Sequence, residues 1–415
     1  MQNPLRHRVA KSIIWNTLGT SIFYISRFLI SIFVVRMSSD YVNIGILTIA
    51  ISISGIWNVI ALFSVRNIQV SDVNNDFTSN EYITSRVVTV LLALIICVIH
   101  AVVFTGDVYK TLVVFAYMLF MVSMSYADVM YGILQKNWRM DLIGISHILK
   151  CAVFLTTFLL LFYYFDLLSA VVGLALTTIA IVFTFDTKAA QKYANIRIII
   201  NFRRIYLLLK LCFPLVVVSL FSTLIPSVTR LVLERLTDLE TLGIYGSVTL
   251  PAAAIQILLT SIFAPFVNVF AQHFYEKNYK GFLRVYIMGI AVISAVFLMF
   301  RSLMFPFGDW LIGLVFGAGM VPYTYLFEEA ILYCFLVCLC LFIMIPLIVL
   351  RYLKTIMVIY SIGIAVCLCL LNTMIINFGA SGANYIQIIS YAVIFVVSFI
   401  ANIVIFKNAF SPVSH

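Results

Sequence analysis

The sequence predicts an all-helical integral membrane protein, with twelve transmembrane helices in two pseudo-symmetric six-helix lobes. The first observation is composition: 64% of the 415 residues are apolar and 10% are charged, and the mean hydropathy is +1.13. Soluble domains are about half apolar and a quarter charged, which excludes a soluble enzyme, a disordered chain and a nucleic-acid-binding protein. The second is that apolar stretches of about 20 residues, the length of a membrane span, recur along the chain. The third is a basic segment near the middle.

The first six apolar stretches occupy residues 12–35, 44–65, 87–105, 111–134, 142–165 and 168–185. The first follows Arg6, Arg8 and Lys11, as in a signal peptide. It is too long for a signal sequence and no small-residue cleavage site follows it, so we expect a retained span. Only Asp166 separates the fifth stretch from the sixth, which predicts a tight helical hairpin.

The other six stretches occupy residues 207–229, 243–268, 285–300, 330–350, 355–376 and 385–406. Residues 187–206 are rich in lysine and arginine, and we interpret them as a linker between an N-terminal lobe, 1–186, and a C-terminal lobe, 207–415. The segment 301–329 is apolar but contains prolines, glycines and Trp310. We expect a long loop there that lies partly in the outer membrane interface, where tryptophan is favoured.

The basic residues predict the topology. If the N-terminus is inside, nineteen lysines and arginines lie on the inner side and five on the outer side, while Arg27 and Lys150 fall within spans. Such a bias orients membrane proteins with their basic loops in the cytoplasm. We therefore expect both termini to be cytoplasmic, and the net charge of +10 reflects topology rather than nucleic-acid binding.

Motifs of soluble enzymes are absent from the sequence. It has no phosphate-binding loop, no His-Glu-x-x-His and no nucleophile elbow, so ATP-driven transport by this chain alone is unexpected. The eight cysteines lie in apolar stretches, which argues against a disulfide framework. Two close pairs, Cys338/Cys340 and Cys367/Cys369, point to different helix faces and have no neighbouring histidine or carboxylate. We expect no metal site and no cofactor.

Arg27 lies past the middle of the first span. A charge in the hydrocarbon costs several kcal/mol, so it normally faces a partner or a water-filled cavity. One interpretation is that Arg27 holds an anionic group in a central cavity. The other is that it reaches toward the outer interface or pairs with a carboxylate such as Asp40.

Asp128 and Lys150 form a second intramembrane pair of interest. Each lies about one-third of a span from the inner face, on consecutive antiparallel helices, so the two side chains are expected to meet. They form either a cavity wall that binds polar substrate groups or a coupling proton, or a buried ion pair that fixes helix register. Both interpretations stay open.

Arg230 ends the seventh span together with Glu234. Rim charges there are normally solvated, but Arg230 has a possible repeat partner in Arg27. Each of these arginines precedes a span that opens with Gly-Ile. Transporter repeats place substrate sites at their interface, which makes Arg230 a second candidate ligand. Gln256 and Asn268 in the eighth span can bind sugar hydroxyls or pack against neighbouring helices.

Five short segments carry a family resemblance: Phe213-Pro214, Thr229-Arg230-Leu231, Leu242-Gly243-Ile244-Tyr245, Leu311-Ile312-Gly313-Leu314-Val315-Phe316-Gly317 and Phe378-Gly379-Ala380-Ser381-Gly382-Ala383. With the twelve spans, they resemble the polysaccharide (O-antigen) flippase family of the multidrug/oligosaccharidyl-lipid/polysaccharide exporter superfamily. Members often carry an aspartate where this chain has Thr229. Glu234 or Asp128 is therefore the candidate for ion coupling.

The resemblance implies two lobes that form a V around a hydrated, cationic central cavity and that rock between inward-open and outward-open states. It implies an undecaprenyl-diphosphate-linked oligosaccharide as cargo, moved from the inner to the outer leaflet of a bacterial inner membrane. It also implies H⁺ or Na⁺ as a coupling ion, and a polysaccharide polymerase and chain-length regulator as partners in lipopolysaccharide biosynthesis. Arg27 and Arg230 would then bind the diphosphate with bidentate contacts, and Lys150 would bind the substrate as part of the cavity wall.

Four alternatives stay open. A cation-coupled drug or small-molecule antiporter of the same superfamily would present carboxylates to its cavity, whereas the intramembrane charge here leans basic. A flippase for peptidoglycan precursors usually has additional spans. A membrane glycosyltransferase or polymerase needs acidic or basic residues in a sizeable outer loop, and residues 301–329 offer only Asp309, Glu328 and Glu329. A structural scaffold leaves the intramembrane charges unexplained.

Overall fold

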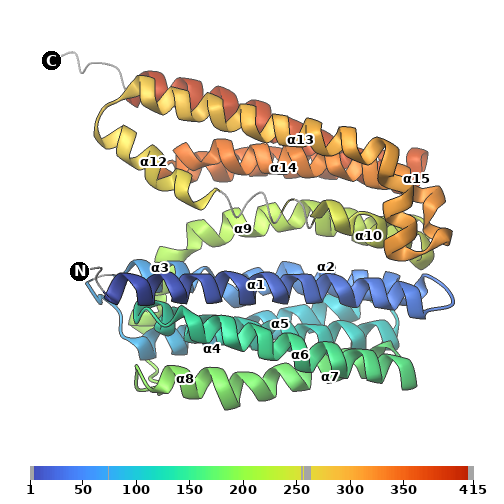
Figure 1. Cartoon of the computed structure of the whole chain (residues 1–415), viewed down its shortest axis with the longest axis horizontal. Helices are drawn as coiled ribbons and strands as arrows, with labels where there is room; N and C mark the ends of the chain where they lie inside the picture. Colours follow the sequence, from blue (N-terminus) through green and yellow to red (C-terminus); the bar gives the residue numbers. More distant parts are fainter. Residues whose placement is uncertain (1–3, 73, 254–255, 257–262, 410–415) are drawn as a thin grey trace. The chain divides into compact units, whose positions relative to one another are not determined.

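Every regular element that the structure describes is a helix, in agreement with the sequence prediction. The structure is a computed structural model that describes residues 4–72, 74–253, 256 and 263–409 (Figure 1). The chain divides into two compact units, Met1–Leu220 and Phe221–His415. The division falls inside one long helix, α9 (Phe202–Leu236), whose first half belongs to the N-terminal unit.

The N-terminal unit is a bundle of helices that lie lengthwise beside one another (Figure 1). Helix α5 is central, because it packs against α2, α4 and α7, while α6 packs against α1 and α7. The elements are α1 (Pro4–Met37), α2 (Val42–Leu62), α3 (Val65–Ser71), α4 (Ser79–Thr105), α5 (Val108–Lys136), α6 (Met140–Tyr164), α7 (Leu167–Ile181), the π-helical segment η1 (Val182–Asp186) and α8 (Thr187–Gln191).

In the C-terminal unit, α14 packs between α13 and α15, and α12 packs against both α13 and α14. A cluster of buried aromatic rings around Phe342 joins these helices. The elements after α9 are α10 (Leu239–Val248), α12 (Ala264–Tyr275), α13 (Tyr279–Phe316), η2 (Ala318–Tyr323), α14 (Thr324–Val349) and α15 (Leu353–Ala409).

Ten helical segments in the described residues are long and apolar enough to cross a membrane. One of them, α15, consists of two helices, because Gly379 has φ 56° and ψ −129°. Gly363 in the first half contacts Ile394 and Ser390 in the second, so the two halves run antiparallel. They supply the predicted spans 355–376 and 385–406. The predicted span 243–268 corresponds to α10 and α12 and lies partly outside the described residues.

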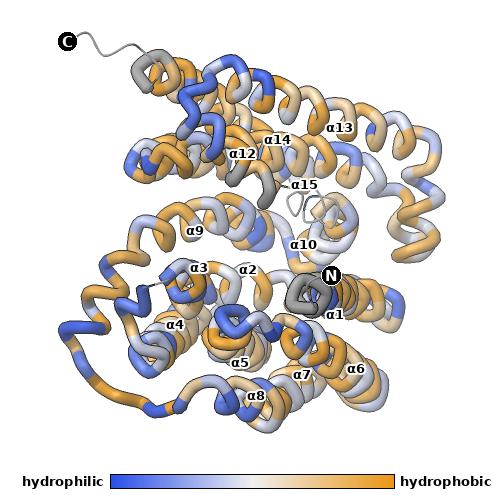
Figure 2. The backbone as a smooth tube through the Cα atoms, turned by 60° about the vertical axis from the view of Figure 1, so that its left-hand side comes forward, coloured by the Kyte–Doolittle hydropathy of each residue, from blue (hydrophilic) through white to orange (hydrophobic). Residues whose placement is uncertain are grey.

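Polar side chains define the ends of several helices. The side chain of Asp166 accepts a hydrogen bond from the Ser169 N–H at 2.9 Å and caps α7 two residues after α6 ends. This confirms the predicted tight hairpin. Thr78 and Glu81 form a capping box at the start of α4. Figure 2 shows hydrophobic residues along the helices and hydrophilic residues in the connecting segments near α3 and α8.

The expectation of a long loop over residues 301–329 is wrong. Helix α13 continues through Pro306 to Phe316, and the 3₁₀-helix η2 leads directly into α14. The break falls at Gly317, whose φ of 104° favours glycine. The physical reason is that an apolar segment next to lipid must satisfy its backbone hydrogen bonds internally, which a helix does.

Helices α1 and α6 of the N-terminal unit approach each other until their backbones touch. A Cβ atom at Gly19 would overlap the backbone of Gly144, and a Cβ atom at Gly144 would overlap the carbonyl of Trp15. Small residues let membrane helices approach until their backbones touch, which maximises van der Waals contact. Gly144 is therefore required by the distance between these helices.

We predict that Gly144→Ala destabilises the protein by about 1–3 kcal/mol, because the added methyl group separates α1 from α6. The midpoint temperature of thermal unfolding of the purified protein measures the effect. Size-exclusion chromatography checks beforehand that each variant is monodisperse. Gly55→Ala in α2 is the matched control, because a Cβ there meets nothing within 4 Å. Equal thermal stability of the two variants would refute the assigned role of Gly144.

Candidate functional site

Arg27 lies in a small pocket of the N-terminal unit whose polar partners are neutral. Its Nη2 donates to the hydroxyl of Tyr117 at 2.9 Å, and the guanidinium lies 5.7 Å from the ring centre of Phe120. The pocket has a volume of about 20 Å³, which is room for about one water molecule. The side chain of Asp40 instead accepts from the N–H of Val42. The alternative pairing of Arg27 with Asp40 is therefore wrong.

Asp128 does not meet Lys150, so the expected pair is wrong. The Oδ1 of Asp128 accepts from Arg66 at 3.0 Å, and its Oδ2 accepts from Arg86 at 2.9 Å. Arg66 also donates to Gln135 at 2.8 Å. Because one carboxylate balances two cations, protonation of Asp128 would leave both guanidinium groups without a counter-charge.

Arg86 is fully buried because it completes the end of α2. Phe63 and Ser64 both have positive φ and break the chain between α2 and α3. The last carbonyl groups of α2 then lack helical partners. Arg86 donates to the carbonyls of Ala61, at 2.8 Å, and Leu62. A cation at a helix C-terminus is also favoured by the helix dipole.

The loop that leads into α4 depends on Asp72. Its carboxylate accepts hydrogen bonds from the N–H groups of Asp76 and Phe77 and from the hydroxyl of Tyr82, at 2.8–3.1 Å. Burial opposes ionisation, but these hydrogen bonds outweigh it and lower the pKa of Asp72 below its ordinary value. The stabilisation is therefore present at neutral pH and is lost as the pH falls through that lowered pKa. The loop fixes the start of α4, which carries Arg86.

Lys150 instead forms a fully buried ion pair with Asp186. The two charged atoms are 2.6 Å apart, and neither side chain is exposed. Lys150 also donates to the hydroxyl of Tyr131 at 2.7 Å, and that hydroxyl lies 3.0 Å from Ser146. Asp186 is the last residue of the π-helical segment η1, a distortion that is frequent at functional sites. The Nδ1 of His147 is buried beside this group without a hydrogen-bond partner in the described structure.

In the C-terminal unit, Arg230 is half-buried in α9, and its guanidinium interacts electrostatically with Tyr245, Tyr333 and Cys334. Its Nε is buried and has no hydrogen-bond partner in the described structure. Thr229, next to Arg230 in the chain, is buried and donates to the carbonyl of Ile225. Arg230 therefore resembles Arg27 in having neutral neighbours.

A polar network next to Arg230 includes the carboxylate of Glu329. Glu329 accepts hydrogen bonds from Asn384 and Ser381, each at 3.0 Å. The Oδ1 of Asn384 accepts from the hydroxyl of Tyr245 at 3.1 Å, and Gln387 donates to the same hydroxyl at 2.7 Å. The network therefore connects α10, α14 and α15 through hydrogen bonds between neutral groups and one carboxylate.

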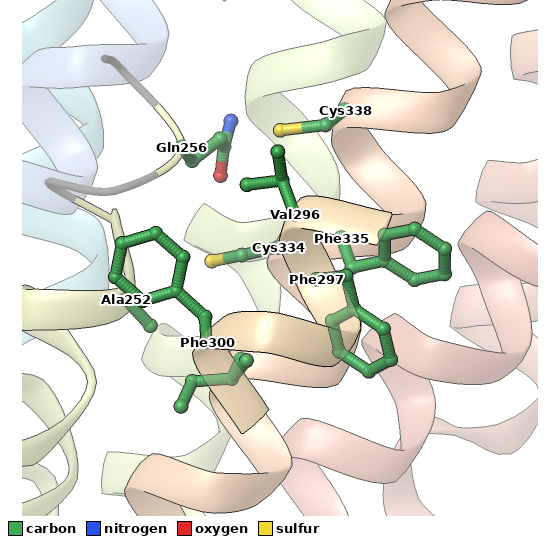
Figure 3. A pocket seen from close by; sticks show the side chains of 9 residues that line it. Ala252, Gln256, Val296, Phe297, Phe300, Cys334, Phe335 and Cys338 are labelled. Atoms are coloured by element: carbon green, nitrogen blue, oxygen red, sulfur yellow. The ribbon is translucent and has the colours of Figure 1, made fainter. Parts of the chain in front are cut away.

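The remaining candidates occupy different surroundings. Gln256 borders a cavity of about 20 Å³ whose other lining residues are apolar, among them Cys334 and Phe297 (Figure 3). Glu234 is half-buried near the end of α9. Asn268 belongs to α12, but its side chain lies outside the described part of the structure.

Sequence analysis missed three polar residues that the structure places at the centre of these groups: Arg86, Asp186 and Asn384. It noted Glu329 only as a carboxylate of the expected loop over residues 301–329. Asp186 and Arg86 lie directly beside predicted spans, so the sequence alone places them in solvent-exposed loops. The signal for Asn384 was present, because buried polar residues recur at helical spacing along the second half of α15. These residues are Asn384, Gln387, Ser390, Ser398 and Asn402.

Comparison with known proteins identifies the family to which this architecture belongs. A family model described as "Polysaccharide biosynthesis protein" matches residues 9–274. The chain is similar to "Capsular polysaccharide biosynthesis protein CapF" of Staphylococcus aureus. The two are 27% identical over 316 residues, which cover 70% of this chain and 73% of the relative.

Solved structures share the fold. An inward-facing multidrug resistance MATE family transporter of the MOP superfamily matches with a TM-score of 0.72 and 11% identity, over 97% of this chain and 100% of that chain. The lipid II flippase MurJ in an inward closed conformation matches with a TM-score of 0.70 and 14% identity, over 96% of this chain and 90% of that chain. The chain therefore has the fold of the MOP superfamily.

We predict that Lys150→Ala destabilises the protein by about 3–5 kcal/mol, because it leaves Asp186 buried without a counter-charge. The double variant Lys150→Met/Asp186→Leu removes both charges and is expected to recover most of the lost stability. The stabilities of the single and double variants are compared by thermal unfolding. Transport by the stable double variant separates the two open interpretations: retained transport assigns the pair a structural role, and lost transport assigns it a functional one.

Proposed function

We propose that the chain, which belongs to the polysaccharide biosynthesis family and has the fold of the MOP superfamily, is a flippase for lipid-linked oligosaccharides. The cargo is an undecaprenyl-diphosphate-linked repeat unit, and it moves from the inner to the outer leaflet of a bacterial inner membrane. Transport occurs by alternation of the protein between inward-open and outward-open states. A polysaccharide polymerase and a chain-length regulator act on the exported unit.

One observation supports this proposal more than any other: the guanidinium of Arg27 has only neutral polar partners among the described residues. An unpaired charge within the membrane is costly, so an anionic ligand is the natural counter-charge. A sugar diphosphate cannot cross hydrocarbon unaided, because its charges lose their hydration. Arginine binds phosphate oxygens with two parallel charge-assisted hydrogen bonds.

Arg230 is the proposed second ligand of the diphosphate, because its neighbours Tyr245 and Tyr333 are also neutral. Lys150 is a weaker candidate, since Asp186 already balances its charge. Gln256 and Asn268 are proposed contacts for sugar hydroxyls. A drug antiporter for organic cations is the alternative that the MATE fold supports, but cationic cargo requires carboxylates where Arg27 and Arg230 stand.

Transport is proposed to be coupled to a proton or sodium gradient. Asp128 and Glu234 are the candidates from the sequence, but Asp128 already forms ion pairs with two arginines. Glu329 suits proton uptake better, because its hydrogen-bond donors Asn384 and Ser381 are neutral. Protonation there changes the net charge of the network. The charged and titratable groups around it are the neighbouring Glu328, Tyr325 and Tyr385, and, through Tyr245, Arg230.

We predict that deletion of the protein abolishes surface polysaccharide while lipid-linked repeat units accumulate on the cytoplasmic leaflet. Complementation with Arg27→Ala is expected to restore at most a tenth of the export, because a charge-assisted hydrogen bond contributes about 1.5–3 kcal/mol. Immunoblots of surface polysaccharide and of membrane-inserted protein give the two readouts.

The matched control is Arg36→Ala, which removes an exposed arginine from the same helix and is expected to export normally. If a strain without a second copy of this gene still makes normal surface polysaccharide after the deletion, the proposed function is wrong. Full export by Arg27→Ala would remove Arg27 from the site but leave the function standing.

We predict that Glu329→Gln makes transport in proteoliposomes independent of an imposed pH gradient, because the amide cannot take up a proton. The hydrogen bond from Asn384 is preserved, so folding is expected to survive. Glu234→Gln is the parallel variant. A pH response that is unchanged in Glu329→Gln but lost in Glu234→Gln would assign coupling to Glu234 instead.

A further inference from the structure

The N-terminal unit contains a large polar cavity that is separate from the Arg27 pocket. Its volume is about 450 Å³, within the usual range for ligand sites. It lies at the end of the bundle that the basic residues assign to the cytoplasm, where α2 ends and α5 approaches its last turns. The residues that line it are Val59, Leu62, Ser64, Arg66, Asn67, Asp128, Gln135 and Ser219.

The charged groups at this cavity and directly behind its wall have an excess of positive charge, because Arg66 and Asp128 line the cavity and the buried Arg86 also pairs with Asp128. Asp128 is the acceptor for both Arg66 and Arg86, whereas three other ion pairs, Lys150–Asp186, Arg139–Asp141 and Arg204–Glu81, each match one cation with one carboxylate. The C-terminal carbonyls of α2 offset part of the charge of Arg86. A positive balance still remains, and the polar wall favours an anion.

The two arginines differ in their freedom to meet a ligand. Arg86 is held by Asp128 and by two backbone carbonyls, and its side chain is 0% exposed. Arg66 is 28% exposed and lines the cavity. Its Nη1 and Nη2 each donate to a side-chain acceptor, Asp128 and Gln135. A ligand oxygen can replace the Gln135 amide without uncovering a buried charge, because Arg86 continues to balance Asp128.

We propose that this cavity binds a diphosphate ester through Arg66, as the first protein contact of the cargo's head group on the cytoplasmic side. Arg66 exchanges its bond to Gln135 for a bidentate contact with two phosphate oxygens. Asn67 and Ser64 line the same wall, next to the ligand. The assignment of this ligand as cargo rests on the proposed flippase function, but the diphosphate site itself does not.

Cysteine labelling tests the site in the full chain. Asn67 is exposed and lines the cavity, whereas Ser71 is exposed on the same short helix and is not among the lining residues. Asn67→Cys and Ser71→Cys proteins in phosphatidylcholine nanodiscs are treated with a water-soluble maleimide, and the labelled peptide is quantified by mass spectrometry. Inorganic pyrophosphate is expected to slow labelling at position 67 at least threefold and to leave position 71 unchanged.

Variants of Arg66 decide whether that residue holds the ligand. Arg66→Gln in the Asn67→Cys protein is expected to raise the pyrophosphate concentration needed for protection at least tenfold. Arg66→Lys keeps the charge, loses the bidentate geometry and gives an intermediate value. Arg139→Gln removes an arginine of another ion pair outside the cavity and is expected to protect normally. Equal loss in Arg66→Gln and Arg139→Gln, or no protection at all, would overturn the site.

Two further arms separate the source of the ligand from the function. Undecaprenyl diphosphate added to the nanodiscs is expected to protect position 67 more strongly than phosphatidylglycerol at the same mole fraction. Equal protection by the two lipids would overturn the cargo assignment. If pyrophosphate protects but deletion leaves surface polysaccharide normal, the site stands and the proposed function fails. If pyrophosphate does not protect while export depends on Arg27, the function stands and the site fails.

Discussion

A charge within the bilayer must find its counter-charge inside the protein, and this constraint arranges the polar residues of the chain. Lys150 meets it with Asp186, and Arg86 meets it with Asp128 and the end of α2. Arg27 donates to the neutral hydroxyl of Tyr117, and Arg230 interacts electrostatically with the neutral Tyr245 and Tyr333. Compensated charges hold helices together, whereas uncompensated charges are suited to hold a ligand.

The same requirement acts on the backbone. Because lipid offers no hydrogen bonds, an apolar segment is stable only when its N–H and C=O groups are paired within the protein. Helix α13 therefore continues through Pro306, and the broken end of α2 is completed by a buried arginine. Where helices touch without side chains between them, as at Gly19 and Gly144, glycine permits the contact. As a result, the charged side chains that line the cavities are carried by helices whose positions are fixed by packing.

The proposed cargo has a negative head group and a lipid tail. The family model and the capsular polysaccharide relative point to polysaccharide biosynthesis, and the arginines of the N-terminal unit suit the diphosphate of the proposed cargo. In the proposed sequence of events, Arg66 receives the head group at the cytoplasmic end, and Arg27 holds it during the change of state. The chemistry proposed for the cargo follows from these arginines.

The sequence by itself determined the helical class, the positions of most spans and the hairpin at Asp166, because hydropathy and capping residues act locally. It also made Arg27 a candidate site residue, since a lone arginine in an apolar run is visible without coordinates. Tertiary structure decided the partners: Lys150 pairs with Asp186 rather than Asp128, and Glu329 joins Asn384. The physical reason is that a charge within the bilayer pairs with whichever counter-charge the helix packing brings near, and sequence distance does not encode that packing.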